Sequence, residues 1–332
     1  MQLKKIAEHF GVSVSTVSRA LSNKTNISTP IRRKIKKYAE SIGFVPDITA
    51  SNLRKGQSNI IGIMVPSIAN TFYESFLAEI ERQTKKNNYS IITLQSFDNA
   101  EQELENIHIF QRLKICSLFV CLASGSNNEK KIVEEFKDKI VIFFDKVPMS
   151  GNYFTVTISD KEATELALNQ LRLANKKNVL GIFSNPYFSI TKFREKAFNE
   201  YFKNYKNITS NSKTINSTIR YSLNSDECMN ILEQIWQGPS HPDCIFCMTD
   251  EILVSVMKFI QKKQIKYPKN IRIIALSNGS IPYYYYPEIS FVQTNGGSLA
   301  ALVFDFFIEI KNKETTELAR MVKPIFFNNQ SL

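Results

Sequence analysis

The chain is 332 residues long, which is more than a single small domain needs and indicates two or three domains. Hydrophobic residues make up 43% of the chain, enough to fill large buried cores. The formal net charge is +11, and residues 1–59 hold eleven basic and three acidic residues, which leaves only +3 for residues 60–332. A uniformly basic surface would not concentrate the positive charge in the first sixth of the chain. The concentration indicates that residues 1–59 form a local basic module that binds phosphate groups.

The composition also bears on compartment and metal binding. The N-terminal segment lacks the apolar core of a signal peptide, and the longest apolar run is too short to span a bilayer. The five cysteines are an odd number. Cys244 and Cys247 lie in the apolar run CIFCM, which is typical of a core strand, and neither a second pair nor clustered histidines complete a zinc site. We expect a cytoplasmic protein with buried, reduced thiols and with no metal or other cofactor.

Residues 3–21 predict two helices joined by a tight turn. Four apolar residues recur at the spacing of one helix face: Leu3, Ile6, Ala7 and Phe10. Gly11 permits the turn, and the hydroxyl of Ser13 can cap the second helix. That helix turns Val17 and Leu21 inward and presents the other face outward: Val14, Ser15, Ser18 and Arg19. A helix of this kind can lie in the major groove of DNA.

A third helix is expected after Ser28, with Pro30 in its first turn and Gly43 at its end. Its inner stripe is formed by Ile31, Ile35, Tyr38 and Ile42. Residues 46–56 then form a short polar segment, which the residues alone allow to be either a flexible linker or a short helix that is unstable by itself in water.

The segment GVSVSTVSRAL at residues 11–21 resembles the recognition segment of the lactose-repressor (LacI/GalR) family of bacterial transcription regulators. The likeness continues through SNKTNISTPIRRKI and then through GFVPDITASNLRKGQSNIIGIMVPSIANTFYESFLAEIE, which resembles the hinge and the opening of the regulatory core. A weaker likeness extends to about residue 327. The start of the first helix departs from the family pattern, because Gln2, Lys4 and Lys5 stand where a capping hydroxyl and an acid are usual.

The resemblance implies which residues contact DNA. Val14, Ser15 and Arg19 would read base edges, and Arg19 can pair with guanine, although an arginine on a phosphate is the alternative. Four polar residues would position the head on the backbone: Thr16, Ser18, Asn23 and Lys24. In the hinge, Ala50 and Leu53 match the family, and Leu53 would enter the minor groove as an apolar wedge.

From residue 60 onward, short apolar runs alternate with amphipathic stretches, which predicts α/β architecture with parallel sheets covered by helices. The expected strands are 60–65, 89–94, 116–122, 140–144, 154–158, 178–183, 212–216, 243–248, 271–276, 289–293 and 322–327. The expected helices are 72–86, 100–113, 160–174, 190–205, 225–236, 249–264 and 297–312.

The resemblance implies a helix-turn-helix head, a hinge helix and a two-subdomain core like that of periplasmic binding proteins. The head would cover 1–45, the hinge and linker 46–58, and the core 59–332. One subdomain would comprise 59–158 and 291–321 and the other 160–288 and 322–328, with chain crossings near 158–160, 287–291 and 320–323.

By the same resemblance, an effector lies between the subdomains. The residues expected to contact it are Phe72, Tyr73, Arg194, Asp250 and Asn278. Phe72 or Tyr73 can instead pack against the next helix, and Asp250 can instead cap one. Asn278 stands where the family most often has Asp, and Asp145 is interpreted as a structural or rim residue.

The resemblance therefore implies a transcription regulator, which we expect to be a repressor and not an enzyme. It would bind palindromic operator DNA as a homodimer. It would also respond to a small molecule, which we expect to be a carbohydrate. A regulator that needs no ligand remains an alternative, as does a two-lobed solute-binding protein, although the latter class carries an export signal and no DNA-binding head. The three histidines are scattered, and no phosphate-binding glycine loop with its lysine is present, which disfavours an enzyme.

Overall fold

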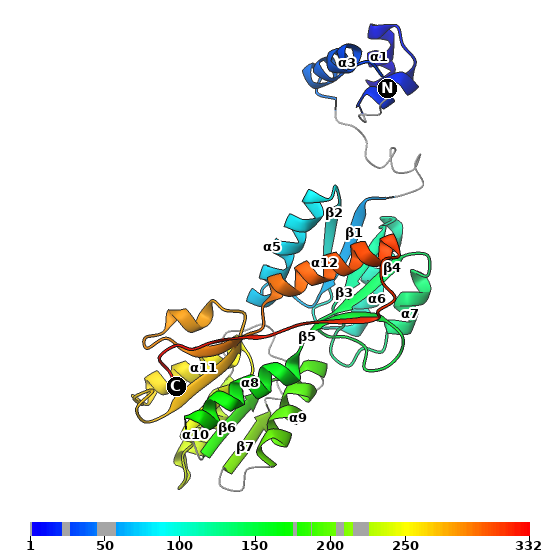
Figure 1. The fold of residues 1–332 in the computed structure, drawn as a ribbon. Coiled ribbons are helices and arrows are strands. Elements are labelled where there is room, and N and C mark those ends of the chain that lie inside the picture. The colour runs from blue at the N-terminus through cyan, green and yellow to red at the C-terminus, as the bar shows by residue number, and fades with distance from the viewer. Residues whose placement is uncertain are drawn as a thin grey trace. The chain divides into compact units, whose positions relative to one another are not determined.

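The computed structural model describes residues 2–21, 27–44, 58–174, 178–186, 188–203, 209–214 and 226–332 (Figure 1). The chain divides into two compact units, Met1–Ser58 and Asn59–Leu332. Four of the residues that we expected to contact DNA lie outside the described residues: Asn23, Lys24, Ala50 and Leu53.

The first unit holds three helices, α1 (Gln2–Phe10), α2 (Val14–Leu21) and α3 (Thr29–Ser41). Gly11 takes a φ of +61° in the turn before α2. The Ser13 hydroxyl accepts a hydrogen bond from the backbone N–H of Thr16 at 3.1 Å, which is the cap that the sequence predicted. The three helices share one small core of buried side chains: Ile6, Ala7, Val17, Ala20, Ile35 and Ala39.

The expected inner stripe of α3 is only partly correct. Ile35 is buried, but Ile31 and Ile42 remain 45% and 36% exposed. Ile31 lies in the first turn of α3 and Ile42 just beyond its last residue, whereas the buried Ile35 and Ala39 lie between them. Tyr38 stacks on His9 with ring centroids 3.9 Å apart. Ser28 stands at the N-cap of α3, but its side chain makes no capping hydrogen bond.

The first part of the second unit is a sheet of six parallel strands in the order β11-β5-β4-β3-β1-β2. The strands are β1 (Ile60–Val65), β2 (Ser90–Gln95), β3 (Ser117–Val120), β4 (Ile140–Phe144), β5 (Phe154–Ile158) and β11 (Ala319–Val322). Its helices are α5 (Thr71–Lys86), α6 (Ala100–Arg112), α7 (Glu129–Glu135) and α12 (Gly296–Asn312). Alternate residues of β1 enter two separate cores: Ile61 and Ile63 pack with α5 and α12, while Met64 packs with α6. We had not predicted α7.

A second six-stranded sheet has the order β12-β10-β9-β8-β6-β7, and only β12 runs antiparallel to its neighbour. The strands are β6 (Asn178–Phe183), β7 (Thr209–Thr214), β8 (Cys244–Cys247), β9 (Arg272–Ser277), β10 (Ser290–Gln293) and β12 (Ile325–Phe327). The helices are α8 (Asp160–Leu173), α9 (Ser189–Lys203), α10 (Asp226–Gln237), α11 (Asp250–Lys262) and the 3₁₀ turn η1 (Ile281–Tyr284). The two sheets with their helices form the first and second subdomains.

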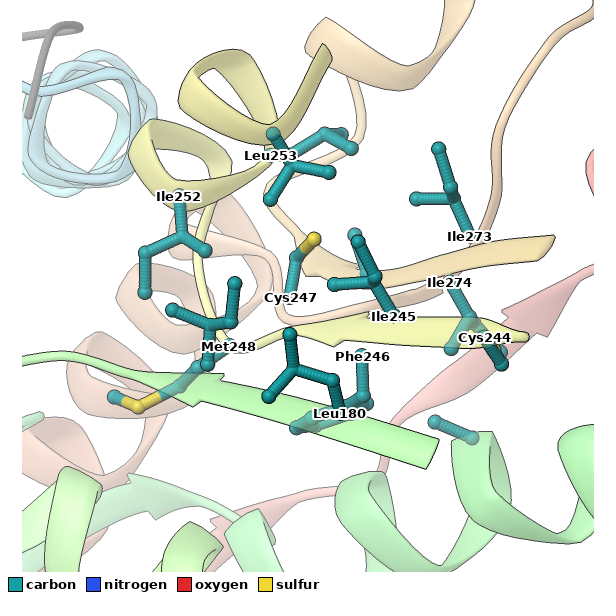
Figure 2. Close-up of a cluster of buried hydrophobic side chains, with 14 of the residues drawn as sticks. Leu180, Cys244, Ile245, Phe246, Cys247, Met248, Ile252, Leu253, Ile273 and Ile274 are labelled. Carbon is teal, nitrogen blue, oxygen red and sulfur yellow. The ribbon is translucent and has the colours of Figure 1, made fainter. Parts of the chain in front are cut away.

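The CxxC pair belongs to the core of the second subdomain. Cys244 and Cys247 are both fully buried on β8, among the apolar side chains drawn in Figure 2. All five cysteines are free thiols, and four of them are buried. The interpretation of CIFCM as a core strand is therefore confirmed. Within the described part of the chain, every helix is too short or too polar to cross a membrane.

Three connections join the subdomains, and one of them differs from the prediction, since the last, at 323–324, adjoins the expected 320–323. The chain passes from β5 to α8 near Ser159, as expected. The expected crossing at 287–291 is wrong, because β10 pairs with β9 and β12 inside the second sheet and the chain crosses only after it, at 294–295. The expected strand 322–327 is two strands in different sheets, β11 and β12. Pro324 lies between them, and its missing N–H prevents a continuous ladder.

Helices α5 and α12 lie side by side in the first subdomain (Figure 1). They lie in tight contact at Gly296, the first residue of α12. A Cβ atom there would lie 2.1 Å from the carbonyl oxygen of Phe72 and 2.6 Å from the Ser75 hydroxyl. Only a glycine therefore allows the two helices to meet at this point, which also fixes the start of α12 beside Phe72.

We expect Gly296→Ala to lower the free energy of unfolding of the full chain by about 1–3 kcal/mol, because the new methyl group forces α12 away from α5. Gly297→Ala is the matched control, since a Cβ atom there would meet Asn295 Oδ1 at 3.0 Å and the Ser75 carbonyl oxygen only at 3.7 Å. Urea denaturation followed by circular dichroism measures both variants. Equal midpoints for the two variants would show that the contact at Gly296 is not restrictive.

Candidate functional site

Helix α2 presents a continuous outer face. Val14, Ser15 and Arg19 are exposed, while Val17 on the opposite side is fully buried. Thr16 and Ser18, also expected to contact DNA, are half-buried on the same helix. The Ser13 hydroxyl lies 2.7 Å from that of Ser15 and 2.9 Å from that of Thr16, so the first turn carries a short hydroxyl cluster.

The first unit also exposes several basic side chains. They are Lys4, Lys5, Arg19, Arg33, Lys34 and Lys37. A small helical unit with an exposed recognition helix and this charge can approach a phosphate backbone and place short side chains on base edges.

The second unit contains a cleft lined by all five residues that we expected to contact an effector: Phe72, Tyr73, Arg194, Asp250 and Asn278. Its cavity of about 110 Å³ has room for several water molecules or a small organic molecule. The residues converge because they follow the carboxyl ends of strands or lie in the first two turns of the next helices, and the carboxyl ends of parallel strands share one edge of a sheet.

The aromatic pair at the start of α5 performs two different tasks. Phe72 is half-buried, and its ring meets that of Tyr73 edge to face at 5.4 Å. Tyr73 is buried, and its hydroxyl donates a hydrogen bond of 2.6 Å to Oδ2 of Asp145. Asp145 follows β4 with a φ of +58° and also lines the cleft. From the sequence, Asp145 was expected to be a structural or rim residue, and its hydrogen bond with Tyr73 was not predicted because the two residues are far apart in the chain.

Both cations of the cleft are already paired. Arg194 Nε donates to Asp160 Oδ1 at 2.6 Å, and its Nη1 donates to the carbonyl of Met248 at 3.0 Å. Burial raises the pKa of Asp160, and the charge of Arg194 acts in the opposite direction. Lys146 Nζ lies 2.9 Å from Asp98 Oδ1 and 4.0 Å from the ring centre of Phe188. Neither Lys146 nor Phe188 was predicted, because no motif marked them.

Asp250 lies in the first turn of α11, but it does not cap that helix. Thr249 does so, with its hydroxyl accepting from the N–H of Ile252 at 3.3 Å. The Asp250 carboxyl instead accepts hydrogen bonds from the hydroxyl of Ser277 at 2.5 Å and from the N–H of Asn278 at 3.0 Å. Burial raises the pKa of Asp250 to about 6, against the effect of these hydrogen bonds. The capping role considered for Asp250 is therefore wrong.

The side chain of Asn278 bridges the two subdomains. Its Nδ2 donates to the carbonyl of Thr71 at 3.1 Å. Its Oδ1 accepts from the Ser75 hydroxyl and from the N–H of Gly296, each at 3.0 Å. The side chain that we expected to anchor a ligand is thus engaged with α5 and α12.

A second bridge joins Asn70 to Glu251 across the cleft. Asn70 Oδ1 caps α5 by accepting from the N–H of Phe72 at 2.9 Å, and its Nδ2 donates to Glu251 Oε1 at 2.8 Å. Neither Asn70 nor Glu251 was predicted from the sequence to contribute to the cleft. The only sequence signal that could have indicated a role for Glu251 in the cleft was its position directly after Asp250.

Comparison with protein families gives two matches that together span most of the chain. Residues 2–47 match the model of the bacterial regulatory proteins of the lacI family, and residues 61–284 match the periplasmic binding protein domain. Among curated proteins, catabolite control protein A of Priestia megaterium is similar, with 23% identity over 94% of this chain and 93% of that protein.

Solved structures share the fold at low sequence identity. The lac repressor dimer bound to operator and the anti-inducer ONPF has a TM-score of 0.87 and 14% identity, covering 98% of this chain and 97% of the other. A complex of the transcriptional regulator CelR with cellobiose has a TM-score of 0.72 and 11% identity, covering 99% of each chain.

The raised pKa of Asp250 predicts a dependence of stability on pH. The fold moves this pKa from 3.8 to about 6, so ionisation is harder in the folded chain than in the unfolded chain. Its contribution to stability is therefore complete below about pH 4 and is lost as the pH rises through 6. Asp250→Asn removes the titration, and its amide can still accept from the N–H of Asn278 and donate to the hydroxyl of Ser277.

We therefore expect the free energy of unfolding of Asp250→Asn to rise relative to the unsubstituted protein between about pH 4 and pH 7, by on the order of 2–3 kcal/mol. Urea denaturation across this range measures the difference. Asp305→Asn, which removes an exposed carboxyl on α12, should show no such trend. A pH-independent difference for Asp250→Asn would contradict the prediction.

Proposed function

The chain belongs to the lacI family of bacterial regulatory proteins, and on this basis we propose that it is a cytoplasmic, homodimeric transcriptional repressor controlled by a small molecule. Its affinity for a palindromic operator would depend on a sugar or sugar derivative bound between the core subdomains. The observation that carries the proposal is the combination, in one chain, of a helix-turn-helix unit with an exposed α2 face and a core with a polar, aromatic-lined cleft. We propose no catalytic role.

For the DNA-binding head, we propose that Val14, Ser15 and Arg19 contact base edges in the major groove. The exposure of all three on one helix supports this assignment. Four further residues would hold the head on the DNA backbone: Thr16, Ser18, Asn23 and Lys24. Ala50 and Leu53 of the hinge would also contact the DNA, with Leu53 as the wedge in the minor groove at the operator centre.

For the cleft, we propose that the effector contacts Phe72, Tyr73, Arg194, Asp250 and Asn278. The convergence of these residues on one cavity supports the assignment. The similar structures were solved with ONPF and with cellobiose, which favours a carbohydrate for this chain too. A molecule in the cleft would compete with or reinforce the bridges of Asn278 and Asn70, and thereby change how the subdomains close. Strand β1 of the first subdomain follows directly on the segment from the head, so this change can pass along the chain.

A regulator that responds to no ligand is the second candidate. The bridging role of Asn278 favours it, because the side chain expected to bind a ligand is engaged by Thr71, Ser75 and Gly296. In vitro selection of genomic fragments with the full chain tests DNA recognition. Release of the selected fragment by added small molecules then distinguishes the two candidates.

Arg19→Ala should relax discrimination at one base pair in each half-site of the selected operator, at a cost of about 1–3 kcal/mol per base pair recognised. Arg33→Ala is the matched control, because Arg33 is an exposed arginine on α3 and should weaken binding to all sequences alike. Fluorescence anisotropy on the operator and its single-base variants measures both. If the two variants behave identically, Arg19 contacts a phosphate and reads no base.

Leu53→Ala should weaken binding to the operator and leave non-specific binding nearly unchanged, because only the specific complex is bent by the wedge. Circular-permutation gel shifts measure the bend, and anisotropy measures both affinities. Leu53→Ile keeps an apolar wedge and serves as the control. An unchanged bend angle together with unchanged affinity in Leu53→Ala would reduce residues 46–56 to a tether.

A further inference from the structure

The cationic side chains that line the cleft have partners of opposite charge, whereas its carboxylates have none among the described residues. The charged side chains in its wall are Asp145, Lys146, Arg194, Asp250 and Glu251. Both cations are held by carboxylates that lie behind the wall: Lys146 by Asp98 and Arg194 by Asp160. These four side chains are all largely buried, so each pair is close to neutral as seen from the cavity.

The three carboxylates of the wall have neutral partners only. Asp145 accepts from the Tyr73 hydroxyl, and Glu251 accepts from the Asn70 amide. Asp250 accepts from a hydroxyl and a backbone N–H. Within the described part of the chain, none of the three forms an ion pair. The wall therefore carries an excess of negative charge.

This excess acts on neighbouring groups. The charge of Asp145 contributes to raising the pKa of Asp160, and that of Glu251 contributes to raising the pKa of Asp250, in both cases after the larger effect of burial. An anionic ligand would add to this repulsion and would find both wall cations already occupied. A cationic ligand would relieve it.

We infer that the effector is a polyhydroxylated molecule that carries a protonated amine, of the chemical class of the amino sugars, and that Asp145 binds its ammonium group. The inference deepens the proposed function and rests on it. Asp145 is the acceptor because Tyr73 fixes its Oδ2, while its Oδ1 accepts no hydrogen bond from the described residues. Both oxygens of Asp250 are occupied. Glu251 is engaged through Oε1 in the bridge to Asn70 that joins the two subdomains, whereas Asp145 takes part in no such bridge within the described residues.

Aromatic surface lies in the same cavity. Phe72 and Phe188 both line the cleft, and aromatic side chains of this kind suit the apolar side of a sugar ring. The ring of Phe188 is also held beneath the ammonium of Lys146, which keeps it in place. The cleft thus combines a stacking surface with an unneutralised carboxylate.

Thermal shift and calorimetry on the full chain test the inference with matched sugars. The probes are hexoses and disaccharides, their amino derivatives, their phosphates and their uronic acids. We expect the amino member of the best-binding set to bind more tightly than its neutral parent, and the anionic members to bind least. A phosphate, a uronic acid or the neutral parent that binds as tightly as the amine would overturn the inference.

Asp145→Asn then tests the acceptor. Asparagine tolerates the positive φ at this position and keeps an acceptor for Tyr73, so the variant changes charge more than shape. Affinity for the amine should fall on the order of 10- to 100-fold, and affinity for the neutral parent by much less. Asp305→Asn removes an exposed carboxyl outside the cleft and should change neither. Unchanged amine affinity in Asp145→Asn would overturn the assignment.

Operator release, measured in parallel, separates this inference from the proposed function. If an anionic or neutral sugar binds and alters operator affinity, the regulatory function stands and the amine inference fails. If no member of the panel binds while the operator is still recognised, the effector part of the proposed function fails and the inference fails with it.

Discussion

The side chain of Asn278 is the contact on which the arrangement of the cleft depends. It leaves the second sheet at the end of β9 and reaches α5 and the first N–H of α12, both in the first subdomain. Gly296 makes this possible, because only its missing side chain lets α12 begin beside α5. A neutral amide can donate to the carbonyl of Thr71 and accept from the Ser75 hydroxyl and the Gly296 N–H, whereas a carboxylate could only accept. With Asn at this position, the side chain therefore bridges the two subdomains.

The second constraint is electrostatic. Burying a guanidinium or an ammonium requires a carboxylate beside it, and Arg194 and Lys146 each have one within 3 Å. These pairs remove both cations from the balance of the cleft and leave the carboxylates of its wall without a counter-charge. The carboxylates that have no cationic partner raise the pKa of neighbouring carboxyl groups. The same carboxylates also set the charge that a ligand should carry, so the stability of the cleft and its choice of ligand are linked.

Much of the fold follows from the sequence because it rests on local patterns. The turn at Gly11, the cap at Ser13 and the buried Val17 are set by neighbours within a few residues, so the first two helices were predicted closely. Strands β1 and β4 to β6 were also located, because parallel strands covered on both faces are continuous apolar runs. The convergence of Phe72 with Arg194 was expected from a family resemblance, and no periodicity in the chain could have shown it.

By itself the sequence determined most of the elements, the concentration of charge in the head and the family pattern of the cleft. Only the tertiary structure decided which sheet accepts β10, where the chain crosses after it, and how much of α3 is buried. It also decided that Tyr73 supports Asp145 and that both cations of the wall are neutralised. The physical reason is that helix caps and apolar runs depend on adjacent residues, whereas the state of a buried charge depends on partners that the fold brings from distant parts of the chain.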